Sequence, residues 1–404
     1  MANWLKIKTA FLSTIIIACS AVKELPSFQY SDPFDTTTKP VAEMVKRTFT
    51  DDSVVFASNE FDGARLTSFE RINDSSFLVT ILPENEPINP SPWYALKLWS
   101  TTSQGICLYF DYGSFKHRYY PKISSDGTIW ANLDSARIVT DSAGRFDYLK
   151  IDLNLEDTLW LAGQDVINSK QTTMWAKQFA GKNNLYFNVI GQSRLGRDLI
   201  MIDSDPKNQE KKIIAILSRQ HPPEVTGFMA MQYFLEEMFN SENSEAFLKK
   251  YRVLIFPLMN PDGIDLGYWR HSAGGVDLNR DWADYNQPEV RNVAEYIYHQ
   301  SNGERVILGI DFHSTYRDVF YTNDTLSEYT YVKEYWFDYM EANIPNYEVN
   351  EKISPITKPV SKSWFYVAFG AEGVTYEVGD NTPDELIELK GRSSARGILQ
   401  SLTK

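Results

Sequence analysis

The pattern of apolar and polar positions divides the chain into two parts with different predicted secondary structure. In the first part, short apolar runs are separated by turn residues such as Ser125-Asp126-Gly127, and long helical patterns are missing. Short strands at this spacing are typical of an antiparallel β-sandwich. We therefore predict a β-sandwich domain over residues 46–168, with strands at 77–82, 93–99, 106–110 and 159–161.

The second part alternates apolar strand patterns with amphipathic helical patterns. Within residues 225–239, for example, apolar side chains recur at helical spacing, as at Val225, Phe228 and Met229. This alternation is typical of an α/β domain whose mixed sheet is flanked by helices. We predict such a domain over residues 169–404, with strands at 212–217, 253–256, 306–310 and 373–378 and helices at 225–239, 288–300, 328–342 and 384–402.

Residues 1–18 have the pattern of an export signal. Two lysines precede an uncharged apolar run that is too short to cross a hydrocarbon core of about 30 Å. Residues 16–19 resemble a bacterial lipobox, which predicts lipidation of Cys19 and attachment to the cell envelope through that lipid alone. Secretion after cleavage of a plain signal is the alternative. Residues 19–45 are rich in Pro, Ser, Thr and Asp, and we predict that they form a tether.

Composition excludes several classes of protein. Lysine and arginine total 40 against 53 aspartates and glutamates, and this formal net charge of −13 argues against a nucleic-acid-binding surface. Two cysteines, Cys19 and Cys107, cannot supply a disulfide framework or a cysteine-rich zinc module. We expect Cys107 to be buried in a strand. The five histidines remain as candidates for metal binding or acid–base chemistry.

Two of the histidines follow predicted strands. His221 comes after strand 212–217 and three residues before Glu224, a spacing that places both side chains on one side of a helical first turn. His313 comes after strand 306–310, and the carboxyl ends of neighbouring strands can converge in an open α/β sheet. Imidazole and carboxylate are both zinc ligands, although this motif is a weak signal by itself. His117 and His299 are expected to be structural or at the surface, and His271 is expected at the surface, with a place in the wall of a substrate cleft as the alternative.

Polar side chains in two later segments are candidates for substrate binding and catalysis. Arg270, Asn279 and Arg280 lie in one predicted loop, and a guanidinium fork matches a carboxylate, although solvated ion pairs are the usual fate of single arginines. Glu377 stands among apolar residues of strand 373–378, where a carboxylate is unfavourable unless it is paired or functional. Beside a metal it would serve as a general base, and the alternative is the solvent face of the strand.

Taken in order, these segments resemble the M14 family of zinc carboxypeptidases. Residues 190–197 are similar to the strand-turn segment that opens the family's catalytic domain, and residues 88–94 resemble the β-domain of the cytosolic-carboxypeptidase (deglutamylase-like) branch. The resemblance covers roughly residues 175–380 and rests on these motifs: His221-x-x-Glu224, Asn260-Pro261-Asp262-Gly263, Arg270, Asp277-Leu278-Asn279-Arg280, His313 and Glu377.

The resemblance implies a zinc metallocarboxypeptidase that removes C-terminal residues from peptides with a free C-terminus. One Zn²⁺ per chain would be bound by His221, Glu224 and His313, and Glu377 would be the general base. Two other functions stay open at this point. One is an M14-type amidohydrolase that deacylates N-acyl amino acids, and the other is a non-catalytic surface protein that binds through its β-domain.

The resemblance also implies roles in substrate binding. Asn279 and Arg280 would bind the terminal carboxylate of the peptide, and Arg270 would polarise the scissile carbonyl. Lys358 and Lys362 lie upstream of the general base, in the region that shapes the side-chain pocket in this family. A lysine in that pocket would favour an acidic terminal residue, and solvated loop lysines are the alternative.

Overall fold

The computed structural model describes residues 24–154 and 157–403. The predicted signal 1–18 and Cys19 lie outside the described residues, so lipidation and an envelope location stay predictions. Among the helices of the described chain, none is both long enough and apolar enough to cross a bilayer.

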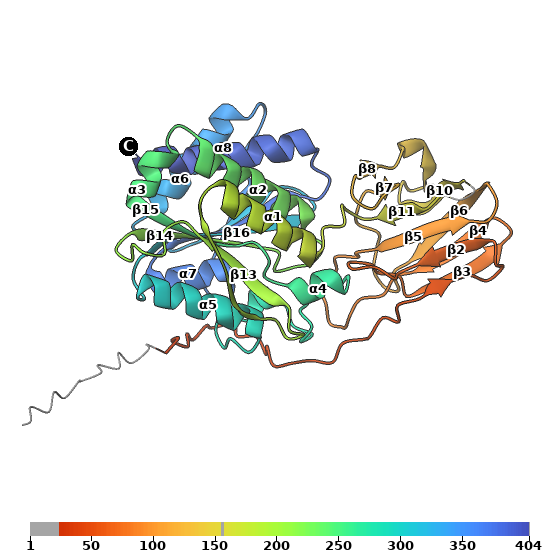
Figure 1. Cartoon of the computed structure of the whole chain (residues 1–404), viewed down its shortest axis with the longest axis horizontal. Helices are drawn as coiled ribbons and strands as arrows, with labels where there is room; N and C mark the ends of the chain where they lie inside the picture. Colours follow the sequence, from red (N-terminus) through yellow and green to blue (C-terminus); the bar gives the residue numbers. More distant parts are fainter. Residues whose placement is uncertain (1–23, 155–156, 404) are drawn as a thin grey trace, which may run out of the picture.

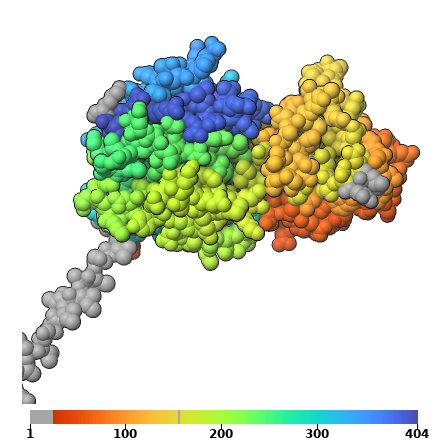
Figure 2. Space-filling view, turned by 45° about the horizontal axis from the view of Figure 1, so that its top comes forward, coloured from red at the N-terminus to blue at the C-terminus, as the bar shows by residue number. Residues whose placement is uncertain are grey.

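The two halves of the chain form two bodies of different architecture, one built of strands and the other of helices around a sheet (Figure 1). This confirms the predicted fold class. A second view shows the surfaces of the two bodies meeting along a continuous boundary (Figure 2). Across this boundary, the Nε of Arg118 donates to the Oδ2 of Asp380 at 2.8 Å, with both side chains buried. Trp269 of the helical half is packed into the core of the β-rich half. The interface between the two halves therefore contains a buried ion pair and a side chain that is shared with the core of the β-rich half.

The β-rich half is a sandwich of a six-stranded and a five-stranded sheet within the described chain. The first sheet runs in the order β1 (Thr48–Phe49), β2 (Val55–Ser58), β5 (Ala95–Ser100), β11 (Leu159–Ala162), β7 (Lys122–Ser124), β8 (Ala131–Asn132). The second runs in the order β3 (Ser68–Asn73), β4 (Ser76–Thr80), β6 (Gln104–Asp111), β10 (Phe146–Leu153), β9 (Ile138–Thr140).

The sandwich departs from the prediction at two points. Strands β4 and β6 pair in parallel, because the chain crosses to the other sheet as β5 and returns beside β4 in the same direction. The expectation that Cys107 would be buried was also wrong, since this residue is half-buried in β6. Side chains alternate along a strand, and Ile106 and Leu108 are the ones that point into the core.

The helical half is built on a mixed eight-stranded sheet. Its order is β12 (Tyr186–Gln192), β13 (Asp198–Asp203), β15 (Tyr251–Phe256), β14 (Lys212–Ser218), β16 (Val306–Thr315), β19 (Glu372–Gly379), β17 (Val319–Asn323), β18 (Glu351–Ser354). The flanking helices are α1 (Ser169–Lys182), α2 (Val225–Asn240), α3 (Ser244–Lys250), α4 (Pro261–Asp265), α5 (Pro288–Ser301), α6 (Thr330–Asn343), α7 (Ser361–Phe369), α8 (Asp384–Thr403).

The central strands are apolar throughout because helices cover both faces of the sheet. Along β14, Ile214 and Ile216 pack under α1, α2, α6 and α8, whereas Ile213, Ala215 and Leu217 pack under α5 and α7. Figure 1 shows these two helical layers above and below the sheet. A strand buried on both faces favours a continuous apolar run, as the sequence has here. Functional side chains are consequently confined to the strand ends and the loops that follow them.

Strand β16 is longer than predicted. The prediction ended it at 310, but it pairs in parallel with β19 as far as Thr315 opposite Gly379. His313 therefore lies within the strand and not in the loop after it. The continuous apolar run stops at Ile310 because polar side chains at Asp311 and His313 then alternate with Phe312, which still packs in the core.

The described part of the predicted tether lies first against the helical half and then, from Ala42, against the β-rich half. The backbone N–H of Asp32 donates to the carbonyl of Thr357, and that of Lys39 donates to the carbonyl of Gly274, both at 2.8 Å. Side chains add to this attachment, because the Oγ1 of the buried Thr36 donates to a carboxylate oxygen of Asp281. Residues 24–45 are thus bound along the surface, and Asp32 reaches the rim of the cavity described below.

The first turn of α2 lies directly against β16, and this contact depends on a glycine. A Cβ on Gly227 would lie 2.2 Å from the carbonyl oxygen of His313. We expect Gly227→Ala to lower the free energy of unfolding by about 1–3 kcal/mol, as overpacking does, in denaturant or thermal melts.

Gly181→Ala is the matched control for this substitution. Gly181 lies in α1, and its added Cβ would meet no other atom within 4 Å. Because alanine is the better helix former, this variant should be as stable as the wild type or more so. An unchanged stability of Gly227→Ala would contradict the close approach of α2 to His313.

Candidate functional site

Three ionisable side chains converge at the carboxyl ends of the central strands. The Nδ1 of His221 lies 2.8 Å from the Oε1 of Glu224, and the Nδ1 of His313 lies 2.6 Å from its Oε2. The two Nδ1 atoms are 3.2 Å apart. In the described chain this is the group of His, Cys, Asp and Glu side chains whose ligand atoms are close enough to hold a metal ion. Two imidazoles and a carboxylate are a donor set that suits a catalytic zinc.

The local backbone of this cluster differs from the prediction. His221 and Glu224 were expected on a helical first turn, but α2 begins only at Val225, and Glu224 is the residue that precedes it. Pro222 and Pro223 stand between the two ligands, and a residue before proline is disfavoured in the helical region. The loop therefore approaches the site in an irregular conformation, and the two side chains still converge.

Each histidine of the cluster has a second carboxylate on its other ring nitrogen. The Nε2 of His221 lies 2.9 Å from Asp277, and the Nε2 of His313 lies 2.7 Å from Asp311. Such partners set the orientation of a metal-binding imidazole and favour its outward N–H tautomer. This arrangement leaves both Nδ1 atoms facing Glu224, as a shared metal requires.

Sequence reasoning missed the roles of Asp277 and Asp311. The partners are 56 positions apart in one pair, whereas in the other pair they are near neighbours on one strand. The local signal in the second case was an aspartate two residues before the ligand, since residues i and i+2 lie on the same face of a strand. Gln220 and Ser361 also donate hydrogen bonds to Asp311, which is fully buried.

The electrostatics of the cluster keep its carboxylates ionised where a metal would bind. Burial alone would raise the pKa of Glu224, but the imidazoles of His221 and His313 outweigh it and hold this pKa well below its usual range. The pKa of Asp277 is likewise held far below normal, against the effect of burial, by Arg270 and Arg280.

Glu377 lies beside the cluster. In the parallel pairing of β16 and β19 it is the partner of His313, so the two side chains project from adjacent strands at the same level. Its Oε2 has no hydrogen-bond partner among the described residues. Burial, together with the nearby charge of Glu224, raises the pKa of Glu377 to about 7. A carboxylate with these properties is suited to accept and return a proton near neutral pH.

The three polar residues predicted to bind substrate are placed by a single aspartate. The Oδ2 of Asp277 accepts from the Nε of Arg270 at 2.8 Å, and its Oδ1 accepts from the backbone N–H of Asn279 at 2.9 Å. The second bond caps the short turn Leu278–Arg280. Arg280 is further held by the ring of Phe34 from the N-terminal segment, 5.2 Å from its guanidinium carbon.

The Asn260-Pro261-Asp262-Gly263 motif connects the two loops of the site. The Nδ2 of Asn260 donates to the carbonyls of Gln220 and His271, at 3.1 and 3.0 Å, and its Oδ1 caps α4 by accepting from the N–H of Gly263. These bonds tie the residue before His221 to the residue after Arg270. The motif therefore has a structural role in the site and does not line the cavity.

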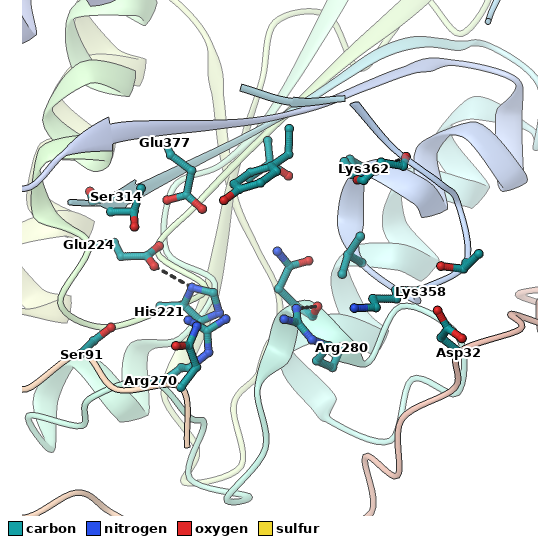
Figure 3. A pocket seen from close by; sticks show the side chains of 18 of the residues that line it. Asp32, Ser91, His221, Glu224, Arg270, Arg280, Ser314, Lys358, Lys362 and Glu377 are labelled. Carbon is teal, nitrogen blue, oxygen red and sulfur yellow. Dashed lines mark hydrogen bonds and ion pairs between the residues drawn. The ribbon is translucent and has the colours of Figure 1, made fainter. Parts of the chain in front are cut away.

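The predicted site residues of the described chain, apart from His313, line one cavity of about 580 Å³. In Figure 3, His221, Glu224 and Glu377 lie on one side, Lys358 and Lys362 lie on the other, and Arg280 lies between them. The β-rich half contributes part of the wall. The lining residues outside the predicted set include Asp32, Asn89, Ser91, Arg118, Ser314 and Tyr321.

The two lysines of the cavity differ in their surroundings. Lys358 is exposed, whereas Lys362 is 5 % exposed and donates from its Nζ to the Oδ1 of Asn323 at 2.7 Å. Burial lowers the pKa of Lys362 to about 8. Lys362 is therefore a buried cation in the wall of the cavity, and the alternative of a solvated loop lysine describes only Lys358.

The remaining histidines lie outside the metal cluster. His299 is exposed on α5, and the Nδ1 of His117 lies 2.8 Å from the hydroxyl of Tyr112, so the expectation holds for both. The expected surface position of His271 was wrong. This residue is buried, and its Nδ1 lies 2.6 Å from the Oδ1 of Asn85 in the β-rich half.

Comparison with known proteins agrees with this site. The family model of zinc carboxypeptidases, M14, matches residues 172–394, and the chain therefore belongs to that family. Cytosolic carboxypeptidase 6 of Mus musculus is 35 % identical over 147 residues, which cover 33 % of this chain and 27 % of that protein. The alignments with the first curated relatives span about a third of their length or less.

Solved structures share the fold of both halves. A metallo-carboxypeptidase from Burkholderia cenocepacia superposes with a TM-score of 0.69 at 18 % identity, covering 86 % of this chain and 98 % of that one. A metallo-carboxypeptidase from Pseudomonas aeruginosa, solved in complex with (2-guanidinoethylmercapto)succinic acid, gives 0.67 at 16 % identity, covering 85 % and 98 %. This likeness extends over the β-rich half as well as the α/β half.

The ligand set predicts a direct effect on metal content. His221→Ala should remove one of three protein ligands, so the purified variant should lose stoichiometric zinc in elemental analysis. His299→Ala, which removes an exposed histidine from α5, should bind as much zinc as the wild type. Full zinc occupancy in His221→Ala would exclude His221 from the ligand set.

Proposed function

We propose that the protein is a zinc-dependent carboxypeptidase that removes single residues from the C-terminus of peptides. The observation that carries the proposal is one cavity whose wall includes two members of the His-Glu-His cluster, a glutamate of raised pKa, and the arginines Arg270 and Arg280. Zn²⁺ would be held by His221, Glu224 and His313. When bound, it would polarise the scissile carbonyl and lower the pKa of an attacking water.

The remaining chemistry belongs to side chains of this chain. Glu377 would take the proton of the attacking water and return it to the leaving amine, which needs a carboxylate that titrates near the working pH. Arg270 would stabilise the negative charge that develops on the carbonyl oxygen. Because Asp277 holds both Arg270 and the ring of His221, this guanidinium is oriented before substrate enters.

Selectivity for a chain end follows from the position of Arg280 between the metal cluster and the far wall of the cavity (Figure 3). A guanidinium and the amide of Asn279 can bind the α-carboxylate of a terminal residue, and an internal peptide bond offers no such group. The side chain of that residue would then project towards Lys358 and Lys362. We propose on this ground that an acidic terminal residue is preferred.

A peptide library digested with and without a zinc chelator tests this activity. Mass spectrometry should show chelator-sensitive loss of single C-terminal residues. Release of N-acyl groups would favour the amidohydrolase alternative, and no turnover by zinc-loaded protein would favour a binding protein.

The general base predicts a variant that binds metal without turnover. Glu377→Gln keeps the shape of the side chain but cannot accept the proton, so kcat should fall at least about 10²-fold. Zinc content should match that of the wild type, because Glu377 is not one of the ligands. Peptidase rates equal to those of the wild type would show that another group is the base.

The buried lysine predicts both a specificity and its pH dependence. We expect a higher kcat/KM for a peptide ending in Glu than for the same peptide ending in Gln. Since the pKa of Lys362 is lowered to about 8, the charge and the preference should be present at pH 7 and decline as the pH rises past 8.

Lys362→Met should lower the Glu-over-Gln ratio while cleavage of the Gln peptide continues, because only Lys358 would then face an acidic side chain. Lys182→Met, at an exposed position of α1, is the matched control and should leave the ratio unchanged. A ratio that is unchanged in Lys362→Met would place the determinant elsewhere in the cavity.

A further inference from the structure

The carboxylate of Glu84 is a buried charge that no step of the proposed mechanism uses. It belongs to the β-rich half, its side chain is fully enclosed, and it accepts hydrogen bonds from three consecutive backbone N–H groups of the other half. The donors are Trp269 at 2.7 Å, Arg270 at 3.0 Å and His271 at 2.7 Å. The guanidinium of Arg65 is also buried in the β-rich half, and its charge interacts favourably with that of Glu84.

Residues 269–271 belong to neither a helix nor a strand, so these three amides have no hydrogen-bond partner within secondary structure. A buried N–H without an acceptor is unfavourable, so the loop depends on a carboxylate from the opposite half. Its flanks are held from the same side. The Nε1 of Trp269 donates to the carbonyl of Trp93 at 3.1 Å, and the ring of His271 contacts Asn85.

Arg270 is the residue at the centre of this loop. Its backbone N–H is bound by Glu84, and its side chain lines the cavity of the proposed active site. Figure 3 shows it beside His221. The backbone of Arg270 is therefore set by one half of the molecule, whereas its Nε is set by Asp277 of the other half. Both anchors are needed to place the guanidinium at a given distance from a bound carbonyl.

We infer that Glu84 is a positioning residue for Arg270, through which the β-rich half takes part in catalysis. The inference rests on the proposed function, in which Arg270 acts on the scissile carbonyl. A displacement of about 1 Å at a catalytic group can lower a rate about 10²-fold. Loss of the Glu84 carboxylate, which holds the loop, should therefore lower kcat. The β-rich half would then contribute a positioning residue to the active site.

The first test replaces Glu84 by glutamine, which has nearly the same shape. Both oxygens of the carboxylate accept hydrogen bonds here, whereas an amide has one acceptor oxygen and a donor NH₂ group. The NH₂ group of the glutamine would therefore face at least one of the three backbone N–H groups. We expect Glu84→Gln to lower kcat about 10- to 100-fold, with little change in KM or zinc content. Glu84→Asp keeps the charge but withdraws it by one methylene, and it should give a smaller loss. Glu86→Gln, at an exposed position nearby, should behave as the wild type.

A double-mutant cycle distinguishes positioning of Arg270 from general damage. In the Arg270→Ala background no guanidinium remains to be misplaced, so adding Glu84→Gln should cause no further loss of kcat. Losses that multiply in the double variant, or wild-type kcat in Glu84→Gln, would overturn the inference.

Hydrogen exchange supplies a readout that is independent of activity. The amides of residues 269–271 should be protected in the wild type and exchange faster in Glu84→Gln, while those of β14 remain protected. Unchanged exchange at 269–271 would overturn the role of Glu84 in the loop. A wild-type protein without peptidase activity would instead contradict the proposed function, and the exchange result would still decide whether Glu84 holds the loop.

Discussion

The site depends on one largely enclosed carboxylate, that of Asp277. Asp277 contacts the Nε2 of His221 with one oxygen and the Nε of Arg270 with the other, and it also caps the turn that carries Asn279. The proposed metal ligand His221, the arginine proposed to act on the carbonyl and the asparagine proposed to bind the peptide terminus are thus oriented by a single anion. The cations around it keep that anion ionised in spite of burial, so the network is held by charge as well as by packing.

Both halves of the chain contribute residues to this network. The α/β half brings the proposed metal ligands to the ends of β14 and β16, and the proposed general base Glu377 lies on the adjacent strand β19. The β-rich half encloses Trp269 in its core and binds the loop after it. The N-terminal segment adds Phe34 against Arg280. Loops in an α/β protein are often mobile, and here three different segments restrain the loops that carry the chemistry.

Most of the fold and the convergence of His221, Glu224 and His313 could be predicted from the sequence, because both leave local signals. Apolar runs and helical spacing marked the central strands and α2, and the order of short motifs marked the zinc-binding family. What could not be predicted depends on partners distant in the chain. The roles of Asp277 and Glu84, the burial of His271 and the attachment of residues 24–45 all arise from contacts between separate segments. The end of β16 was misjudged because its ladder with β19 continues after the apolar pattern stops.

If a zinc-dependent site recognises a free peptide terminus, blocking that terminus should prevent cleavage, and a pair of peptides can show this. The zinc-loaded protein is incubated with a peptide ending in Glu and with the same peptide amidated at its C-terminus, and both products are followed by mass spectrometry. Only the free acid should be shortened, one residue at a time, and a chelator should stop the reaction until zinc is restored. Equal cleavage of both peptides, or cleavage that a chelator leaves untouched, would contradict it.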